Sequence, residues 1–239
     1  MTYKQCLERL RTRHPFAFSR WGDGEWACMA HTAVSRQHAN CDKHRYFQTL
    51  GQALFRVLID KPSYGMGLQP KATQDDPECI IRMLRAAAFT PVWGDADIFH
   101  DASQAGTFWD SFWGAIEEGG YAKVIVGPSS LILDYRIMEH TTEEIMVPER
   151  NCWLNYEATK AKCVEFCEEF LLAHQHPLVL CCCGMMANVL IHELWQMYGE
   201  RVTLLDMGSV FDPYVGKDSR RYHWKIMERE GTCPESQDS

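Results

Sequence analysis

Residues 178–206 read LVLCCCGMMANVLIHELWQMYGERVTLLD, and this stretch decides the fold. Its apolar run 178–183 ends at Gly184, which is typical of a buried strand followed by a turn. Apolar side chains then recur at helical spacing over 185–198, and a second strand-like run over 201–206 ends in Asp206. A strand, a helix and a second strand in this order predict two parallel strands joined by a crossover helix.

The same alternation extends outward along the chain. Expected strands cover 16–19, 122–126 and 142–147, and expected helices cover 3–13, 26–31, 43–59, 77–88 and 154–173. These segments follow one another without a repeat or an obvious linker. We therefore predict an α/β fold, a single Rossmann-like domain over residues 1–227 with a mainly parallel sheet and helices on both faces. The polar residues 228–239 are expected to form a disordered tail.

Length and composition fit a soluble globular protein. The chain has 239 residues, 46% of them hydrophobic and 23% charged, and its net charge is −8. No apolar run approaches the roughly 18 residues that span a bilayer, and the first residues lack a secretory signal, so a cytoplasmic protein is expected. The negative charge argues against a broad nucleic-acid-binding surface.

The chain has 11 cysteines, an odd number, and no Cys-x-x-Cys pair. Cys163 and Cys167 stand one helical turn apart, a spacing that could also serve a structural zinc site. No partner pair lies close in sequence, however. We therefore interpret the cysteines as reduced thiols that pack as small hydrophobic side chains.

The most informative motif follows the first predicted strand and reads Arg20-Trp21-Gly22-Asp23-Gly24-Glu25. Glycines on either side of Asp23 allow a sharp turn, and the two carboxylates can offer hard oxygen ligands to Mg²⁺ or Mn²⁺. Arg20 can add a bidentate contact to a phosphate. The alternative is a plain helix start with Asp23 as its cap.

Two more loops follow predicted strands and suit a nucleotide. Val126-Gly127-Pro128-Ser129-Ser130 offers backbone N–H groups and hydroxyls to a phosphate or ribose, or it is an ordinary turn with a serine cap. It is not a Walker loop, because the ending Gly-Lys-Ser/Thr is absent. After the next strand, Gly184 permits close approach of a ligand, and Asn188 could bond a sugar or base.

Two further carboxylates, Asp206 and Asp212, follow the last predicted strand. The carboxyl ends of parallel strands meet at one edge of a sheet, so both are expected near Asp23 and Glu25. Either could act as the base that takes a proton from an acceptor hydroxyl.

The motif 20–25 resembles the Arg-x-Gly-Asp-Gly-Glu hallmark of the GT-D-type glycosyltransferases, a Rossmann-like class. Later landmarks follow in a similar order: Val126-Gly127, Pro148-Glu149-Arg150-Asn151, Gly184 and Asp206-Met207-Gly208. Cys183-Gly184-Met185-Met186 departs from the Gly-Pro or Gly-x-Thr that is frequent there.

The resemblance implies a metal-dependent transferase whose donor is a UDP-sugar, with UDP-hexose expected. Asp23 and Glu25 would hold Mn²⁺ or Mg²⁺. The donor would lie against Arg20, Trp21, Gly22, Gly127, Ser129, Ser130, Asn151, Gly184 and Asn188.

Two aromatic segments bear on the acceptor. Phe108-Trp109-Asp110-Ser111-Phe112-Trp113 favours core or lid packing. Arg220-Arg221-Tyr222-His223-Trp224-Lys225 mixes cations and rings, a composition that suits phosphates and bases, or it is a solvated surface segment. The expected acceptor is a glycan or protein hydroxyl, or equally a hydroxymethylated base flipped out of phage DNA, with a small-molecule hydroxyl as a less favoured alternative.

Two other functions use the same residues. A non-catalytic nucleotide-binding module would bind nucleotide without turnover of a donor. A metal-dependent phosphoryl or nucleotidyl transferase would share the acidic pair but cleave nucleoside triphosphates.

Overall fold

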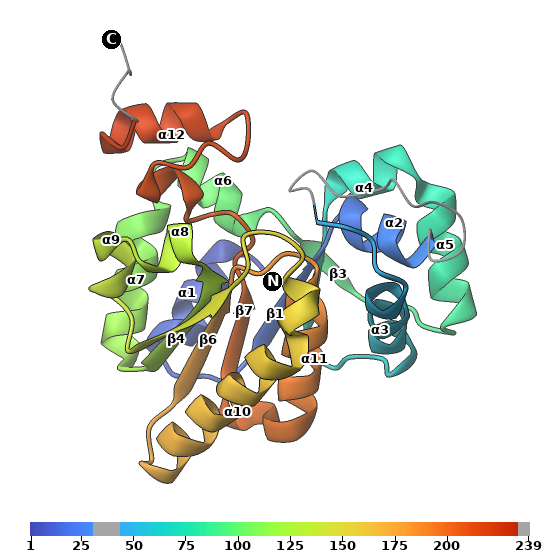
Figure 1. The fold of residues 1–239 in the computed structure, drawn as a ribbon, viewed down its shortest axis with the longest axis horizontal. Helices are drawn as coiled ribbons and strands as arrows, with labels where there is room; N and C mark the ends of the chain where they lie inside the picture. Colours follow the sequence, from blue (N-terminus) through green and yellow to red (C-terminus); the bar gives the residue numbers. More distant parts are fainter. Residues whose placement is uncertain (31–43, 234–239) are drawn as a thin grey trace.

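A computed structural model describes residues 1–30 and 44–233 of the chain. In these residues seven strands form one parallel sheet with the order β3-β2-β1-β7-β6-β4-β5 (Figure 1). The strands are β1 (Ala17–Trp21), β2 (Gly65–Leu68), β3 (Trp93–Asp95), β4 (Ala122–Pro128), β5 (Glu143–Val147), β6 (Pro177–Cys181) and β7 (Thr203–Asp206). The predicted α/β architecture is confirmed.

The strand order reverses between β1 and β7. These two strands are neighbours, with Ala17 opposite Leu204 and Phe18 opposite Leu205. The chain leaves β1 toward β2 and β3 on one side, whereas β4 to β6 lie on the other side. Such a switch point leaves a crevice beyond the carboxyl ends of the two strands, where open α/β sheets bind ligands.

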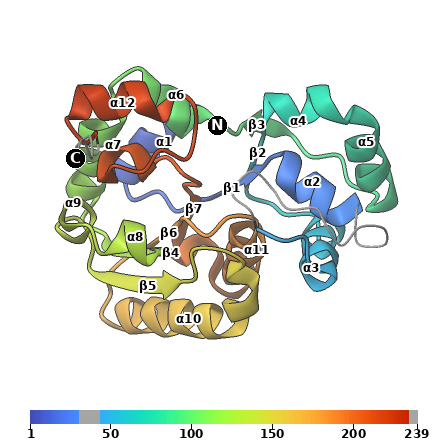
Figure 2. The same ribbon diagram turned by 45° about the horizontal axis from the view of Figure 1, so that its top comes forward.

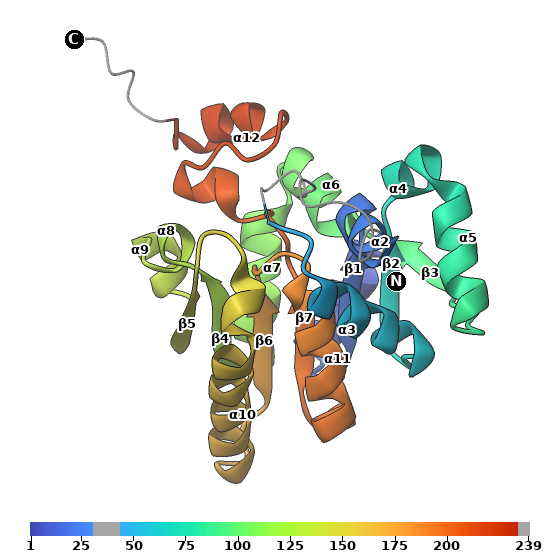
Figure 3. The same ribbon diagram turned by 45° about the vertical axis from the view of Figure 1, so that its right-hand side comes forward.

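Helices cover both faces of the sheet (Figure 2). One face carries α3 (Gln48–Ile59), α10 (Tyr156–Leu172) and α11 (Met186–Tyr198), with α2 (Asp23–Ala30), α4 (Pro70–Asp75) and α5 (Pro77–Ala86) packed beside them. The other carries α1 (Tyr3–Arg11), α6 (Ile98–Gln104), α7 (Phe108–Gly119) and α12 (His223–Glu230). Short helices are α8 (Ser129–Ile132), α9 (Tyr135–Met138), η1 (Cys152–Asn155), η2 (Gly199–Arg201) and η3 (Asp212–Val215). Figure 3 shows α12 above the same end of the sheet as α2 and α6.

Each face of the sheet has its own hydrophobic core, because successive side chains of a strand point to opposite faces. In β1, Phe18 packs among the residues of α1, α6 and α7, whereas Trp21 packs among those of α2, α3 and α11. Nine of the ten described cysteines are buried, and all ten are unpaired thiols. Cys163 and Cys167 belong to the core beneath α10.

Local signals explain where several helices begin. The Thr2 side chain accepts a hydrogen bond from the Gln5 backbone, and the Gln5 side chain accepts one from the Thr2 backbone, which is a capping box. Asp76 caps α5 through the Cys79 N–H, and Pro77 occupies its first turn. In the described part of the chain, no helix is both long and apolar enough to cross a membrane.

The structure corrects several predicted boundaries. It adds strands β2 and β3, which the sequence pattern does not indicate, and the helix predicted over 43–59 begins only at Gln48. The helix predicted over 26–31 already begins at Asp23, and residue 31 lies outside the described part. The predicted tail begins too early, because α12 runs to Glu230 and Arg229 donates hydrogen bonds to the last two carbonyls of α6. Residues 234–239 lie outside the described part.

Candidate active site

A cavity of about 340 Å³ opens beyond the carboxyl ends of β1 and β7. It contains the motif after β1, with Asp23 and Glu25, and it reaches Asp206 at the end of β7. Its other lining residues include Arg20, Gly22, Gln69, Lys71, Asp97, His100, Gly184, Gly208, Arg220 and Tyr222. The cavity therefore lies at the switch point, as the topology predicts.

Asp206 ties the two central strands together beneath this cavity. One carboxylate oxygen accepts the Arg20 backbone N–H at 3.0 Å, and the other accepts the Gly208 N–H at 3.1 Å. The side chain is only 5% exposed. Because both oxygens are engaged by backbone donors, Asp206 fixes the loops after β1 and β7 relative to each other.

Asp23 and Glu25 lie in the first turn of α2. Glu25 folds back so that Oε2 accepts the Gly22 N–H at 2.8 Å, and Asp23 Oδ1 accepts the Gly24 N–H at 3.1 Å. A Cβ at Gly22 would lie 2.8 Å from Gln69 Oε1, so only glycine fits at this turn without a shift. The pair is therefore both a helix start and a wall of the cavity.

The electrostatics of this wall suit a cation. Burial, helped by the neighbouring charges of Asp206 and Asp23, raises the pKa of Glu25 to about 8, although the hydrogen bond from Gly22 opposes the shift. Burial likewise raises the pKa of Asp206 to about 6, although Arg20 opposes the shift. Carboxylates that repel one another around a cavity are stabilised when a divalent ion binds among them.

The donor set also suits such an ion. Carboxylate oxygens are the ligands that Mg²⁺ and Mn²⁺ prefer. Within residues 1–30 and 44–233, no three His, Cys, Asp or Glu side chains form a ready metal cluster. Asp23 and Glu25 would thus leave several coordination positions to water and to phosphate oxygens, as in sites where Mg²⁺ meets a nucleotide.

Arg20 lines this cavity and is held by neighbouring residues. Its Nε donates to the Ala96 carbonyl at 2.7 Å, and Nη2 lies 3.4 Å from Asp97 Oδ1. A Cβ at Gly208 would overlap Arg20 Nη1, and Gly208 has a φ of +55°. Glycine at position 208 therefore leaves the space that the guanidinium occupies.

A second cavity of about 430 Å³ adjoins the first. The two share Arg20, Gly184, Gly208 and Arg220 in their walls. Asp212 lines the second cavity and accepts a hydrogen bond from Ser219 Oγ at 2.5 Å. The two predicted base candidates thus face different parts of one cleft, and Asp212 belongs to the second cavity.

Two of the predicted donor contacts are core side chains that line neither cavity. The Trp21 side chain is fully buried, packs against Trp26 with ring centroids 5.5 Å apart, and donates to Ser19 Oγ. Asn188 is also fully buried, in the first turn of α11, and lines neither cavity. Both side chains belong to the core because of the direction in which their strand or helix projects them.

The loop after β4 contacts the cleft only through another residue. Gly127 packs against Leu131 and Ile132 and does not line either cavity. Ser129 begins α8, and the hydroxyl of Ser130 accepts a hydrogen bond from Lys217 Nζ at 2.6 Å. Lys217 lines the second cavity, so the predicted phosphate loop reaches the cleft through this lysine.

Asn151, a predicted donor contact, lines neither cavity and bonds the segment that contains His44. It adopts a left-handed φ of +60°, and its Oδ1 accepts the Arg45 N–H at 2.8 Å. Its own N–H donates to His44 Nδ1 at 2.9 Å, and His44 lines the second cavity. No local pattern indicates His44 as a site residue, because its position depends on a residue 107 places later.

The members of the segment 220–225 lie in three different environments. Arg220 and Tyr222 face the cleft, and the Tyr222 hydroxyl bonds His100 Nδ1 at 2.7 Å. His223 is fully buried. The remaining members, Arg221, Trp224 and Lys225, are exposed on the surface of the molecule. In the segment 108–113, the rings of residues 108, 112 and 113 are buried in the core, which confirms the packing interpretation.

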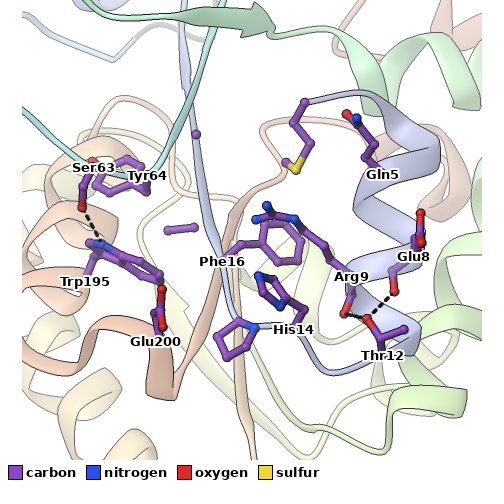
Figure 4. Close-up of a pocket in the computed structure, with 14 residues that line it drawn as sticks. Gln5, Glu8, Arg9, Thr12, His14, Phe16, Ser63, Tyr64, Trp195 and Glu200 are labelled. Atoms are coloured by element: carbon purple, nitrogen blue, oxygen red, sulfur yellow. Dashed lines mark hydrogen bonds between the residues drawn. The ribbon is translucent and has the colours of Figure 1, made fainter.

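Another cavity, of about 670 Å³, lies elsewhere (Figure 4). It opens at the amino ends of β1 and β2, between α1 and the end of α11, where Arg9, His14 and Trp195 line it. The carboxylates of the motif after β1 do not reach it. The chemistry is therefore assigned to the smaller cleft at the opposite edge of the sheet.

The sequence matches no protein-family model and no curated protein. Solved structures do share the arrangement. One is described as the highly conserved domain of unknown function 1792 with a distinct glycosyltransferase fold; it has a TM-score of 0.60 and 16% identity and covers 95% of this chain and 81% of its own. This chain has a glycosyltransferase fold.

A second structure is described as a new glycosyltransferase (DUF1792) from Streptococcus sanguinis. It has a TM-score of 0.59 and 16% identity and covers 96% of this chain and 85% of its own. A selenomethionine-substituted structure of domain of unknown function 1792 gives a TM-score of 0.61 at 15% identity. The fold expected from the motif at 20–25 is therefore confirmed.

Proposed function

We propose that this protein is a metal-dependent glycosyltransferase that moves a hexose from UDP to a hydroxyl acceptor. The observation that carries the proposal is the convergence of Asp23, Glu25 and Asp206 on one cavity at the switch point of a glycosyltransferase fold. The adjoining cavity adds Asp212 on the same cleft. A donor and an acceptor need such neighbouring spaces.

Asp23 and Glu25 are the proposed ligands of Mn²⁺ or Mg²⁺. The bound ion would neutralise the charge of the departing nucleoside diphosphate. Arg20 and Arg220 line both cavities and can hold phosphate oxygens across the boundary between them. Asp206 keeps the loops after β1 and β7 in register, which maintains the spacing of these groups.

Asp212 is the better candidate for the base. It is 9% exposed, it faces the second cavity, and the Ser219 hydroxyl orients its carboxylate. A base must reach the acceptor hydroxyl within hydrogen-bond distance, and Asp212 lies where an acceptor can enter. Asp206, with both oxygens held by backbone N–H groups, is the less suitable of the two.

The acceptor proposed is a glycan or protein hydroxyl rather than a flipped DNA base. A flipped base is usually stacked between aromatic rings, and the described lining of the Asp212 cavity has no Phe, Tyr or Trp side chain. Arg221 and Lys225 are exposed and line neither cavity, and the chain has a net charge of −8. Salt-sensitive retention of hydroxymethylated DNA would instead favour the DNA acceptor.

Release of UDP from a panel of UDP-sugars, with and without EDTA, tests the proposal. Metal-dependent release is expected. Tight UDP binding without turnover would favour the nucleotide-binding module. Cleavage of nucleoside triphosphates, with indifference to the sugar, would favour a phosphoryl or nucleotidyl transferase.

A further inference from the structure

His44 stands at the junction of the two cavities. It lines the second cavity, and its ring lies over Gly184, which lines both. A Cβ at Gly184 would lie 3.3 Å from His44 Nε2, and Gly184 has a φ of +60°. The absence of a side chain at position 184 therefore lets the imidazole approach the backbone at the floor of the cleft.

Asn151 makes two hydrogen bonds to this segment, one with the His44 ring and one with the backbone of Arg45. The Asn151 N–H donates to His44 Nδ1 at 2.9 Å, and Asn151 Oδ1 accepts the Arg45 N–H at 2.8 Å. Since the Arg45 N–H can only donate, the amide oxygen of Asn151 must face it. The left-handed backbone at Asn151, with φ +60°, allows one residue to make both bonds.

The first of these bonds also sets the tautomer of His44. A nitrogen that accepts an N–H cannot carry a proton itself, so the ring proton of neutral His44 belongs on Nε2. Nε2 is the ring atom closest to the space that a side chain at position 184 would occupy, and Gly184 lines both cavities. The proton on Nε2 makes this atom a hydrogen-bond donor without adding a charge.

The second cavity suits an anion. Four cationic side chains line it, Arg20, Arg150, Lys217 and Arg220, against three carboxylates, Glu149, Asp212 and Asp218. In the first cavity the balance is reversed, with three cations against five carboxylates. A diphosphate at the boundary would therefore face the proposed metal site in the first cavity. In the second cavity it would face N–H donors and cationic side chains.

We propose that His44 donates a hydrogen bond from Nε2 to a phosphate oxygen of the nucleoside diphosphate, and that Asn151 is the positioning residue for His44. The assignment deepens the proposed function and depends on it. It gives Asn151 an indirect part in donor binding, through the imidazole, in place of the direct contact expected from the sequence.

Isothermal titration calorimetry with UDP and with uridine, in the presence of Mg²⁺, tests the assignment. His44→Asn keeps an acceptor for the Asn151 N–H but removes the donor at Nε2, whereas His44→Gln can place an amide N–H near the position of Nε2. Because His44→Asn loses one hydrogen bond to a phosphate oxygen, we expect it to bind UDP about 10- to 100-fold more weakly. Its binding of uridine, which has no phosphate, should be unchanged. His44→Gln should bind UDP more tightly than His44→Asn.

Asn151→Gly tests the positioning role, because glycine keeps the left-handed backbone but loses the bond to Arg45. We expect it to weaken UDP binding several-fold and to leave uridine binding unchanged. His14→Asn, the same substitution at the opposite edge of the sheet, is the matched control and should bind UDP normally. Thermal unfolding of each variant reports separately on the fold.

Unchanged UDP affinity in His44→Asn, or an equal loss of uridine and UDP affinity, would overturn the assignment while leaving the transferase proposal standing. The same holds if His44→Gln loses more affinity than His44→Asn. If the unmodified protein binds no UDP with Mg²⁺, or with Mn²⁺ in a repeat titration, both the assignment and the proposed function are wrong.

Discussion

Replacing Gly208 by alanine should lower the free energy of unfolding by more than the strain of the left-handed backbone alone. Gly208 has a φ of +55°, where a side chain costs about 1–2 kcal/mol. The new Cβ would also overlap Arg20 Nη1. Arg20 can swing away only by giving up its bond to Ala96 and its pair with Asp97, at 2.7 and 3.4 Å, which adds roughly 1–3 kcal/mol.

The expected loss in the free energy of unfolding is therefore about 2–5 kcal/mol for Gly208→Ala. Gly231→Ala is the matched control: Gly231 has a φ of +67°, and a Cβ added there would meet no described atom within 4 Å, so only the strain of about 1–2 kcal/mol should be seen. Urea unfolding measures both losses. Arg20→Ala should cost about 1–3 kcal/mol in the unmodified protein but little in the Gly208→Ala background, because the bonds to Ala96 and Asp97 are already lost there. Equal losses in the two glycine variants, or a loss in the double variant equal to the sum of the two single losses, would refute the reasoning.

Three other substitutions test where side chains lie. Asp212→Asn should lower sugar transfer by about 10²- to 10⁴-fold with UDP affinity unchanged, and normal transfer would exclude Asp212 as the base. Arg221→Ala with Lys225→Ala should leave UDP release within about twofold, because both residues are exposed and line neither cavity; a large loss would put substrate on that face. Asn188 is buried, and its amide has no partner among the described residues, so Asn188→Leu should raise the free energy of unfolding by about 1–3 kcal/mol. Loss of UDP affinity in that variant would restore Asn188 as a donor contact.

The sequence predicts the second half of the sheet well and the first half poorly, for a physical reason. Strands β4, β6 and β7 are buried on both faces, so their apolar runs are continuous. Strand β2 reads Gly-Met-Gly-Leu, a weak strand pattern. Its Gly67 is required because a Cβ there would lie 2.7 Å from the Ala96 Cα, and that neighbour becomes visible only in the folded chain.

The residues of the candidate site also differ in how well the sequence predicts them. Asp23 and Glu25 are evident from their spacing and flanking glycines, and their position at the end of β1 follows from the parallel sheet. Whether a neighbouring residue faces the cleft or the core depends on packing, which is why the motif alone does not reveal that Trp21 is buried. The bond between His44 and Asn151 joins two distant segments, so no local pattern can indicate it.

The most direct measurement is UDP release from a UDP-sugar with Mn²⁺, Mg²⁺ or EDTA by the unmodified protein, Asp23→Ala and Glu25→Ala. Asp110→Ala, an exposed carboxylate on α7, is the control. We expect release that requires the metal, disappears in both motif variants and persists in the control. Undiminished, EDTA-resistant release by Asp23→Ala and Glu25→Ala would mean that the acidic pair only starts a helix, and the central proposal would be wrong.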